Sequence, residues 1–293
     1  MKSGFISFIG RPNVGKSTLL NSILGTKLAI TSSKPQTTRD SIQGVYIDGD
    51  VQLIFIDTPG IHKPKNKLGK YINKEAYNNM QDTNLLALVV DVTEPFGRGD
   101  EFVLEKMKET GLPAILVLNK VDKMKREEVL PIIETYQSKY PFEHIIPVSA
   151  LKQENIKELI KVMKEYAKED FWYYDENTLT NKNMNYLITE RIREKIFRLT
   201  EEEIPYSTAV IIEHMEKKKN AYYIIANIIV DRDAVKKIIV GRHGTKIKEI
   251  GIKSRADIEE LLQTKVYLEI FVKTVKKWRD QDKYLTEFGY EKD

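Results

Sequence analysis

The sequence has no cysteine and only four histidines among its 293 residues. Without cysteine no disulfide or thiolate metal site can form, and the scattered histidines lack the spacing of a zinc site. Long apolar runs are missing too: the longest, such as Leu85–Val90, have about six residues, whereas a membrane-spanning helix needs about 20. The N-terminus lacks a basic stretch followed by a long apolar one, so no signal peptide is expected. These absences favour a protein of the reducing cytoplasm.

The composition is otherwise that of an ordinary globular protein. Hydrophobic residues make up 41% of the chain and charged residues 31%, which is enough for packed cores and a hydrated surface. At this length two domains are the expected number. The net charge is only +4, so its distribution along the chain is more informative than its total. Nothing in the sequence demands more than a monomer.

The first half alternates apolar, strand-like runs with helical patterns. The expected strands are Phe5–Ile9, Val51–Ile56, Leu85–Val90, Ala114–Leu118 and Ile145–Val148. Strands separated by helices are typical of a mostly parallel sheet, here an α/β domain of three layers over residues 1–170. A polar, Asn-rich stretch follows. Residues 171–185 are expected to form a linker whose aromatic start, Phe171–Tyr174, packs on one of the domains.

Residues 186–293 have a different order of elements. Helices are expected over Tyr186–Leu199, Asp233–Ile239 and Thr245–Leu262. Strands are expected over Ser207–His214, Tyr222–Val230 and Lys265–Val272, the first two around the basic turn "EKKKN". This order indicates a small α+β domain with an antiparallel hairpin. The lysines of the turn are expected to form a solvated hairpin tip, in preference to an RNA or membrane contact.

The stretch "GRPNVGKST", Gly10–Thr18, lies between the first strand and a helix. It fits the pattern G-x-x-x-x-G-K-[ST], a loop whose backbone N–H groups point at nucleotide phosphates beside the positive end of a helix. Lys16 can reach the β- and γ-phosphates, and the Ser17 hydroxyl can bind Mg²⁺. The residues of this loop expected to contact the nucleotide are Gly10, Asn13, Val14, Gly15, Lys16, Ser17 and Thr18.

Three later motifs, each at the end of a strand, indicate that the nucleotide is GTP. In "DTPG", Asp57 can hold Mg²⁺ through water, and the Gly60 N–H can meet the γ-phosphate. In "NKVD", the Asp122 carboxylate can accept two hydrogen bonds from guanine, whose donor pair adenine lacks. "SAL" fits a backbone contact to the base. The residues expected to contact GTP here are Asp57, Gly60, Asn119, Lys120, Asp122, Ser149, Ala150 and Leu151.

Hydrolysis is expected to depend on electrostatic positioning, because no side chain is an obvious general base. In the loop "KPQTTRD", Thr38 is expected to complete the Mg²⁺ shell and sense the γ-phosphate, with Thr37 as the second choice. Ile61 stands where many GTPases have a water-orienting glutamine, so hydrolysis should be slow. The residues expected to act on the phosphoryl group are Lys16, Thr38 and Gly60, and those around Mg²⁺ are Ser17, Thr38 and Asp57.

Taken together, the motifs are similar to those of the bacterial Era GTPases. The resemblance rests on "GRPNVGKSTLLN", "PQTTRD", "DTPGIHKPKNKLGKYINKEA", "NKVDK", "VSALK", "EEIPYS", "IVGRHGTKIKEIGIKSR" and the ending "VYLEIFVKTVKKWRDQDKYLTEFGY". It implies a P-loop GTPase domain followed by a type II KH domain, binding near the 3′ end of 16S rRNA, and a role in assembly of the 30S ribosomal subunit. In related GTPases the P-loop asparagine, here Asn13, helps to coordinate K⁺. The linker departs from the family, because "TNKN" stands where members are more acidic.

The loop "GRHG", Gly241–Gly244, joins two expected helices, as the G-x-x-G loop of a KH domain does where it clamps about four nucleotides. From Lys236 to Arg255 there are seven basic residues against one acidic residue, Glu249. Such a patch binds RNA in a salt-dependent way. The residues expected to bind RNA are Gly241, Arg242, His243, Gly244, Lys246, Lys248, Lys253 and Arg255.

Two alternatives remain open. The first is a GTP-gated RNA-binding scaffold in which hydrolysis is incidental; Ile61 favours it, whereas the complete phosphate and Mg²⁺ site speaks against a dead enzyme. The second is a peripheral regulator on the inner face of the cell membrane. It would need an amphipathic basic helix, for which the tail Lys273–Lys283 is the candidate and is weakly amphipathic.

Overall fold

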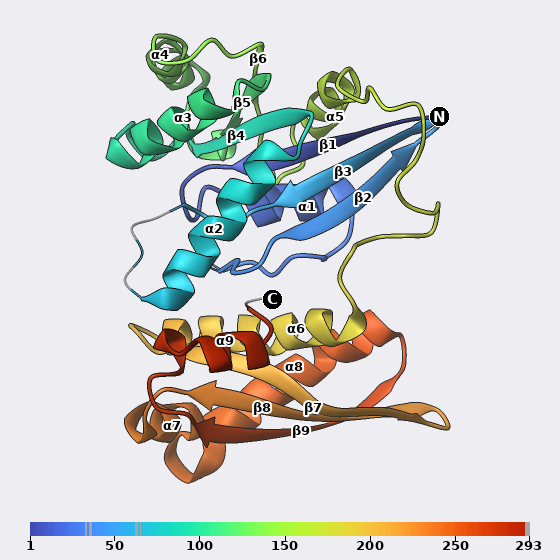
Figure 1. Cartoon of the computed structure of the whole chain (residues 1–293), viewed down its shortest axis with the longest axis vertical. Coiled ribbons are helices and arrows are strands. Elements are labelled where there is room, and N and C mark those ends of the chain that lie inside the picture. Colours follow the sequence, from blue (N-terminus) through green and yellow to red (C-terminus); the bar gives the residue numbers. More distant parts are fainter. Residues whose placement is uncertain (33, 35–36, 62–63, 65, 291–293) are drawn as a thin grey trace. The chain divides into compact units, whose positions relative to one another are not determined.

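The computed structural model describes residues 1–32, 34, 37–61, 64 and 66–290. The chain divides into two compact units, residues 1–63 with 72–181, and residues 64–71 with 182–293 (Figure 1). Within the loop "KPQTTRD", Pro35 and Gln36 lie outside the described residues. Among the helices of the described ranges, none is long and apolar enough to cross a membrane.

A six-stranded sheet forms the centre of the first unit, in the order β2-β3-β1-β4-β5-β6. Its strands are β1 (Lys2–Ile9), β2 (Ile42–Asp48), β3 (Val51–Asp57), β4 (Leu85–Asp91), β5 (Ala114–Asn119) and β6 (His144–Pro147). All neighbours pair in parallel except β2, which runs antiparallel to β3. The mostly parallel sheet expected from the sequence is confirmed, with β2 as an additional edge strand. The central strands are apolar along their length because both faces of the sheet are covered.

Helices cover both faces of this sheet. They are α1 (Lys16–Leu24), most of α2 (Lys67–Gln81), α3 (Arg98–Thr110), α4 (Arg126–Gln137) and α5 (Ile156–Lys164). One apolar cluster joins α2, α3 and α4 to β4 and β5, while α1 and α5 contact β3 and each other on the opposite side (Figure 1). The result is the predicted three-layer arrangement, with the carboxyl ends of the parallel strands at one edge.

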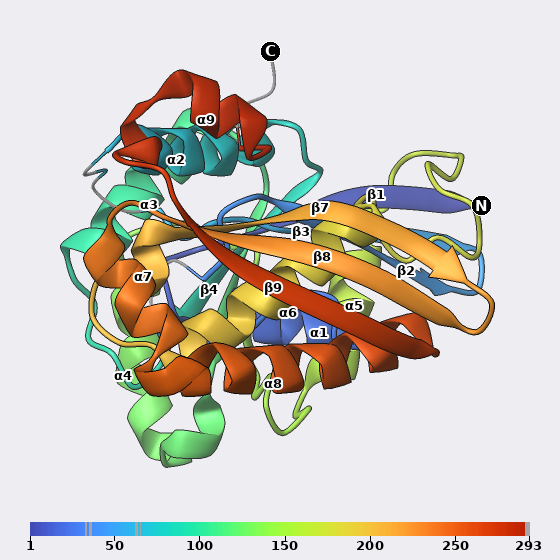
Figure 2. The same cartoon turned by 90° about the horizontal axis from the view of Figure 1, so that it is seen from below.

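The second unit is built on a three-stranded sheet with β8 in the middle (Figure 2). Its elements are α6 (Met184–Leu199), β7 (Thr208–Lys218), β8 (Ala221–Val230), α7 (Asp233–Val240), α8 (Thr245–Leu262), β9 (Lys265–Thr274) and α9 (Asp282–Glu287). β8 pairs antiparallel with β7 and parallel with β9. Ile192, Ile228 and Ile258 lie in the core between this sheet and the helices α6 and α8.

Two details of this unit correct the sequence-based expectations. The strand β7 continues through Lys218, so the basic stretch is mostly strand and the turn is confined to Lys219 and Asn220. Cross-strand pairing with β8 explains the extension, since Lys217 lies over the ring of Tyr222 at 5.5 Å. The tail also differs from a single amphipathic helix: β9 occupies its start, and α9 begins only at Asp282.

The aromatic start of the linker packs on the first unit. Gln52 of β3 is fully buried and accepts hydrogen bonds from the backbone N–H groups of Tyr173 and Tyr174, both at 3.0 Å. The ring of Tyr173 meets Phe5 edge to face with centroids 4.7 Å apart. Further along, the Val45 N–H of β2 donates to the Leu179 carbonyl at 2.9 Å. The linker therefore follows the first unit as far as the outer edge of β2.

Candidate functional site

The loop between β1 and α1 has the geometry of a phosphate-binding loop. Lys16 is the first residue of α1, and its Nζ donates to the carbonyls of Gly10 and Arg11 at 3.1 and 2.9 Å. Gly15 has a φ of 100°, and a Cβ there would lie 2.2 Å from Nδ2 of Asn119, so a side chain is excluded. The loop is thus wound around the Lys16 ammonium, which is poised to move to phosphate oxygens.

Three oxygen-bearing side chains meet beside this loop. The Ser17 hydroxyl donates to Oδ2 of Asp57 at 2.5 Å and lies 3.0 Å from the Thr38 hydroxyl. Thr38 in turn lies 3.4 Å from the same carboxylate oxygen. By contrast, the Thr37 hydroxyl donates to the Lys34 carbonyl at 2.8 Å. Of the two threonines, the geometry therefore favours Thr38 as the metal-side residue.

Burial shifts the two charged groups of this site toward their neutral forms. It raises the pKa of Asp57 to about 6, although the hydrogen bond from Ser17 and the charge of Lys16 lower it. It lowers the pKa of Lys16 to about 8, against the opposing effect of the Asp57 charge. Oδ1 of Asp57 is buried and has no hydrogen-bond partner within the described ranges. A buried carboxylate with one oxygen lacking a hydrogen-bond partner is suited to bind a cation or to accept a hydrogen bond from the water that the cation holds.

The "NKVD" segment holds the phosphate loop and the "SAL" segment together. Asn119, at the end of β5, donates from Nδ2 to the Val14 carbonyl at 2.8 Å and accepts from the Ala150 N–H at 3.0 Å. Lys120 donates to the Asn13 carbonyl at 2.9 Å. Oδ1 of Asp122 accepts a hydrogen bond from Ser149 at 2.6 Å, which orients the carboxylate. The Leu151 side chain is 72% exposed, so only its backbone is suited to a base contact.

The site is a hollow of about 240 Å³ whose wall includes Lys16, Ser17, Thr38, Gly60 and Lys120. The backbone of Gly60 lies against the loop, since a Cβ there would be 2.7 Å from the Pro12 nitrogen. Four loop residues predicted from the sequence also line the hollow: Asn13, Gly15, Thr18 and, as the second-choice threonine, Thr37.

Sequence reasoning missed two groups of residues at this site. One is the segment Ile30, Thr31 and Ser32, which lines the hollow just before the loop "KPQTTRD". The sequence indicates it only through the two polar residues Thr31 and Ser32 that precede this loop. The other is Asp91 at the end of β4, which pairs with Lys120 at 2.5 Å. Its signal was an acid at a strand's carboxyl end, the same position as Asp57 on β3.

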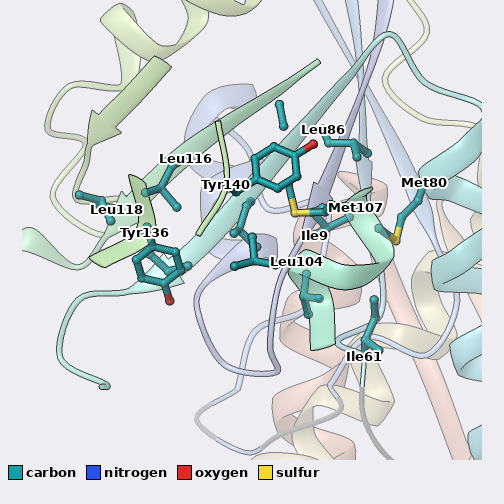
Figure 3. Close-up of a cluster of buried hydrophobic side chains, with 14 of the residues drawn as sticks. Ile9, Ile61, Met80, Leu86, Leu104, Met107, Leu116, Leu118, Tyr136 and Tyr140 are labelled. Carbon is teal, nitrogen blue, oxygen red and sulfur yellow. The ribbon is translucent and has the colours of Figure 1, made fainter. Parts of the chain in front are cut away.

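Ile61, the residue that follows "DTPG", faces the protein interior. It is 6% exposed and belongs to the apolar cluster of Ile9, Met80 and Leu104 (Figure 3). Its side chain is therefore committed to packing and has no polar atom with which to orient a water molecule. This packing agrees with the absence of a water-orienting side chain at this position; the slow hydrolysis inferred from the sequence stays a prediction.

The loop Gly241–Gly244 joins α7 to α8 in the second unit. Gly244 forms the N-cap of α8 in the left-handed conformation, and His243 also has a positive φ of 52°. The side chains around it that were expected to bind RNA are exposed: Arg242, His243, Lys248, Lys253 and Arg255. A helix N-terminus surrounded by exposed cations favours an anionic backbone.

Lys246, which the sequence grouped with these residues, is placed differently. Its side chain is half-buried, and Nζ donates to the Leu199 carbonyl at the end of α6 at 3.0 Å. A lysine in that position satisfies a free helix carbonyl and the negative end of the helix dipole. Lys253 forms an exposed ion pair with Glu249 at 2.7 Å, which is weak enough to be exchanged for a phosphate.

Comparison with known families assigns one family to each half of the chain. The family of 50S ribosome-binding GTPases matches residues 5–120, and the KH domain family matches residues 203–279. The chain is 47% identical over 291 residues to GTPase Era of Clostridium kluyveri, with 99% of each protein covered.

Two solved structures match 100% of this chain and of their own, each with a TM-score of 0.96. One, 40% identical, is an Era variant from Aquifex aeolicus bound to GDP.AlF4⁻. The other, 39% identical, is Era in complex with MgGDPNP and nucleotides 1506–1542 of 16S ribosomal RNA. The second of these relatives thus binds a guanine nucleotide analogue and an RNA segment in one complex.

Proposed function

The chain belongs to the Era GTPase family, and from this membership we propose that it is a GTP-dependent switch that binds the 3′ region of 16S rRNA. It hydrolyses GTP to GDP and phosphate, and it acts in the assembly of the 30S ribosomal subunit in the cytoplasm, where that RNA is found. The observation that carries the nucleotide half is the meeting of Ser17, Thr38 and Asp57 beside the phosphate loop. The relative bound to nucleotides 1506–1542 supports the RNA half.

The residues at the phosphate loop suit GTP in three ways. Lys16 leaves its two loop carbonyls for the β- and γ-phosphate oxygens, which it neutralises. The backbone N–H of Gly60 meets the γ-phosphate, so the segment after β3 senses whether that phosphate is present. Asp122, oriented by Ser149, accepts hydrogen bonds from guanine, and adenine lacks the pair of donors that this carboxylate needs.

The donor set fits Mg²⁺. Ser17 and Thr38 offer hydroxyl oxygens and Asp57 a carboxylate oxygen, which are hard ligands of the kind this ion takes. Ser17 and Thr38 would hold the ion directly, and the unused Oδ1 of Asp57 would accept a hydrogen bond from one of its waters. When bound, Mg²⁺ neutralises charge on the β- and γ-phosphate oxygens.

Hydrolysis in this chain lacks a side chain that orients water, since Ile61 is packed in the core. Asn13 adopts a left-handed backbone conformation with a φ of 67° at the edge of the hollow. We expect it to help to hold K⁺, whose charge would supply part of what an arginine finger supplies in other GTPases. The test is the hydrolysis rate in KCl against NaCl at equal ionic strength; equal rates would contradict a role for K⁺.

RNA binding is assigned to the loop Gly241–Gly244 and the exposed cations beside it, Arg242, Lys248, Lys253 and Arg255. Gly244 has open space where a Cβ would lie, so close approach of a phosphate is unobstructed. The decisive experiment measures affinity for a single-stranded copy of the 16S rRNA 3′ end, with a non-hydrolysable GTP analogue and with GDP. Wild type should bind more tightly with the analogue, and Gly244→Asp should bind weakly in both states.

The second candidate is a scaffold whose RNA binding is gated by GTP and whose turnover is incidental. The burial of Ile61 favours it. RNA-stimulated hydrolysis separates the two functions: a rate that rises on adding the RNA supports the enzyme, and an unchanged rate supports the scaffold. A peripheral membrane contact loses its sequence-based support, because residues 273–283 do not form one amphipathic helix.

A further inference from the structure

A buried carboxylate, Asp100, ties the first turn of α3 to the phosphate loop. Its side chain is 2% exposed, and its Oδ1 lies 3.3 Å from Nε of Arg11 in an ion pair. Arg11 follows Gly10 in the loop and is not among the residues that the sequence motif assigns to the nucleotide. The pair therefore holds the start of the loop from a helix that contributes nothing else to the hollow.

Two further interactions involve Asp100, one at the start of its own helix and one with α4. Its Oδ2 accepts a hydrogen bond from the Gly97 N–H at 3.0 Å, which caps the start of α3. On α4, burial and then the adjacent Asp100 carboxylate hold the pKa of the Tyr136 hydroxyl well above its usual range. The ring of Tyr136 lies in the apolar cluster, with its hydroxyl pointing away from Leu116 and Leu118 (Figure 3). Asp100 is thus a rigid anchor point.

The backbone of Arg11 takes part in the site itself. Its carbonyl accepts the hydrogen bond from Lys16 at 2.9 Å. The carbonyls of Asn13 and Val14 are held from β5 and the segment after it, by Lys120 and Asn119. The Arg11 side chain holds the start of the loop to α3 through its ion pair with Asp100, so losing that pair removes an anchor from this end of the loop.

We propose that Asp100 is a positioning residue for the nucleotide: through Arg11 it fixes the start of the phosphate loop, so that Lys16 and the loop N–H groups face the phosphates before the nucleotide arrives. The proposal rests on the proposed GTP site and adds the residue that preorganises it. A loop already in its bound conformation loses little conformational entropy on binding. Losing the anchor should therefore weaken nucleotide binding more than it slows the chemical step.

The test compares Arg11→Gln, Asp100→Asn and the double variant by the dissociation constant of a fluorescent GDP, and by KM and kcat for GTP. We expect each single variant to raise the dissociation constant and KM about tenfold, with kcat changed less than threefold. The double variant should bind GDP no more weakly than whichever single variant binds it less tightly, because the two substitutions break the same ion pair.

Asp100→Asn also weakens the cap of α3, so a matched control is needed. Glu128 caps α4 in the same way, because its carboxylate accepts a hydrogen bond from the Lys125 N–H at 2.8 Å. Unlike Asp100, Glu128 is exposed, and this hydrogen bond does not involve the phosphate loop. Glu128→Gln should weaken the cap of α4 and leave GDP affinity unchanged, so a loss of GDP affinity cannot be ascribed to a weakened helix cap alone.

A second variant moves Arg11 without removing a charge. A Cβ at Gly99 would lie 2.8 Å from Cδ of Arg11, so Gly99→Ala should displace the guanidinium and weaken GDP binding about threefold. Alanine is the better helix former, so thermal stability should not fall.

If Arg11→Gln and Asp100→Asn both bind GDP as tightly as wild type, the positioning role of Asp100 is contradicted. It is also contradicted if the losses of binding free energy in the two single variants add up in the double variant. If wild type itself does not bind GDP, the proposed GTP site fails instead, so the two failures are distinguishable.

Discussion

At the scale of single residues, the centre of the GTP site is held in an environment that disfavours its own charges. Asp57 is fully buried, and one of its carboxylate oxygens has no hydrogen-bond partner in the described part of the chain. The neighbouring Lys16 is buried too and donates to two carbonyls of its own loop. Buried charges of this kind are typical of a binding site whose ligands bring charges of opposite sign, here Mg²⁺ for Asp57 and phosphate for Lys16.

The raised pKa of Asp57, about 6 against 3.8, predicts how stability depends on pH without nucleotide or metal. Between these values the folded state binds more protons than the unfolded state, so the Asp57 contribution to stability falls as pH rises. The free energy of unfolding of Asp57→Asn minus that of wild type should grow by about 2.4 kcal/mol from pH 4 to pH 7. Denaturant titrations in EDTA measure it; the exposed control Asp50→Asn should run parallel to wild type.

The orientation of Asp122 predicts a change of nucleotide preference. Asp122→Asn removes the acceptor for guanine and offers an amide donor, which suits the carbonyl that xanthine carries in place of the amino group. We expect GTP affinity to fall roughly 100-fold and xanthosine triphosphate to be preferred, since hydrogen bonds to charged groups contribute about 1.5–3 kcal/mol each. Competition binding with both nucleotides checks this. A loss of affinity for both would mean that the carboxylate holds the loop and does not read the base.

At the scale of elements, β3 and the linker are joined through one side chain. Both polar atoms of the Gln52 side chain form hydrogen bonds with the linker. Oε1 accepts from the N–H groups of Tyr173 and Tyr174, and Nε2 donates to the Tyr174 carbonyl at 2.8 Å. Residues 171–181 of the linker are therefore part of the first unit in structural terms, although their composition is that of a loop.

This junction predicts a local effect of Gln52→Ala. Two backbone N–H groups of the linker lose their acceptor, which favours local opening of the linker. Trypsin should cut after Lys168 or Lys182 about tenfold faster, in line with a loss of about 1.4 kcal/mol in opening free energy. Gln137→Ala, an exposed substitution on α4, serves as control. Equal cleavage rates in both variants would contradict the role of Gln52.

The elements differ in how far their sequences predicted them. The phosphate loop and the strands β1, β3, β4 and β5 were predictable, because buried parallel strands are continuous apolar runs with functional residues at their ends. The strand β2 was not, since "IQGVYID" contains a glycine and belongs to an edge, where the pattern is weak. The contact of Asp100 with Arg11 was out of reach too, because tertiary packing and not spacing brings these residues together. Asp91 could be noted from its place at the carboxyl end of β4, although its pairing with Lys120 could not.

At the scale of the whole molecule, charge is concentrated where RNA is proposed to bind. Residues 236–255 carry seven basic residues and one acidic residue, which is more positive than the whole chain at +4, so the remainder is net negative. An anionic polymer is therefore attracted to one region and repelled weakly by the rest.

The salt dependence of RNA affinity tests this distribution. Lys248→Ala should lower the slope of log affinity against log salt by about 0.7–1, because one exposed phosphate contact is lost. Lys246→Ala should leave that slope nearly unchanged and lower thermal stability instead, since its ammonium serves the end of α6. Equal slope changes in both variants would mean that Lys246 turns to the RNA when it binds.

The pairing of the linker with β2 has a consequence for solubility. β2 is the outermost strand of the sheet, and a bare edge of this kind is a template on which other chains can add strands and aggregate. Leu179 covers it by accepting the hydrogen bond from Val45, and Thr180 bridges to Gly44 beside it. A fragment that ends at residue 170 would expose this edge, whereas one that ends at 181 would keep it covered. The segment that connects the two units thus also protects the edge of β2 from pairing with strands of other chains.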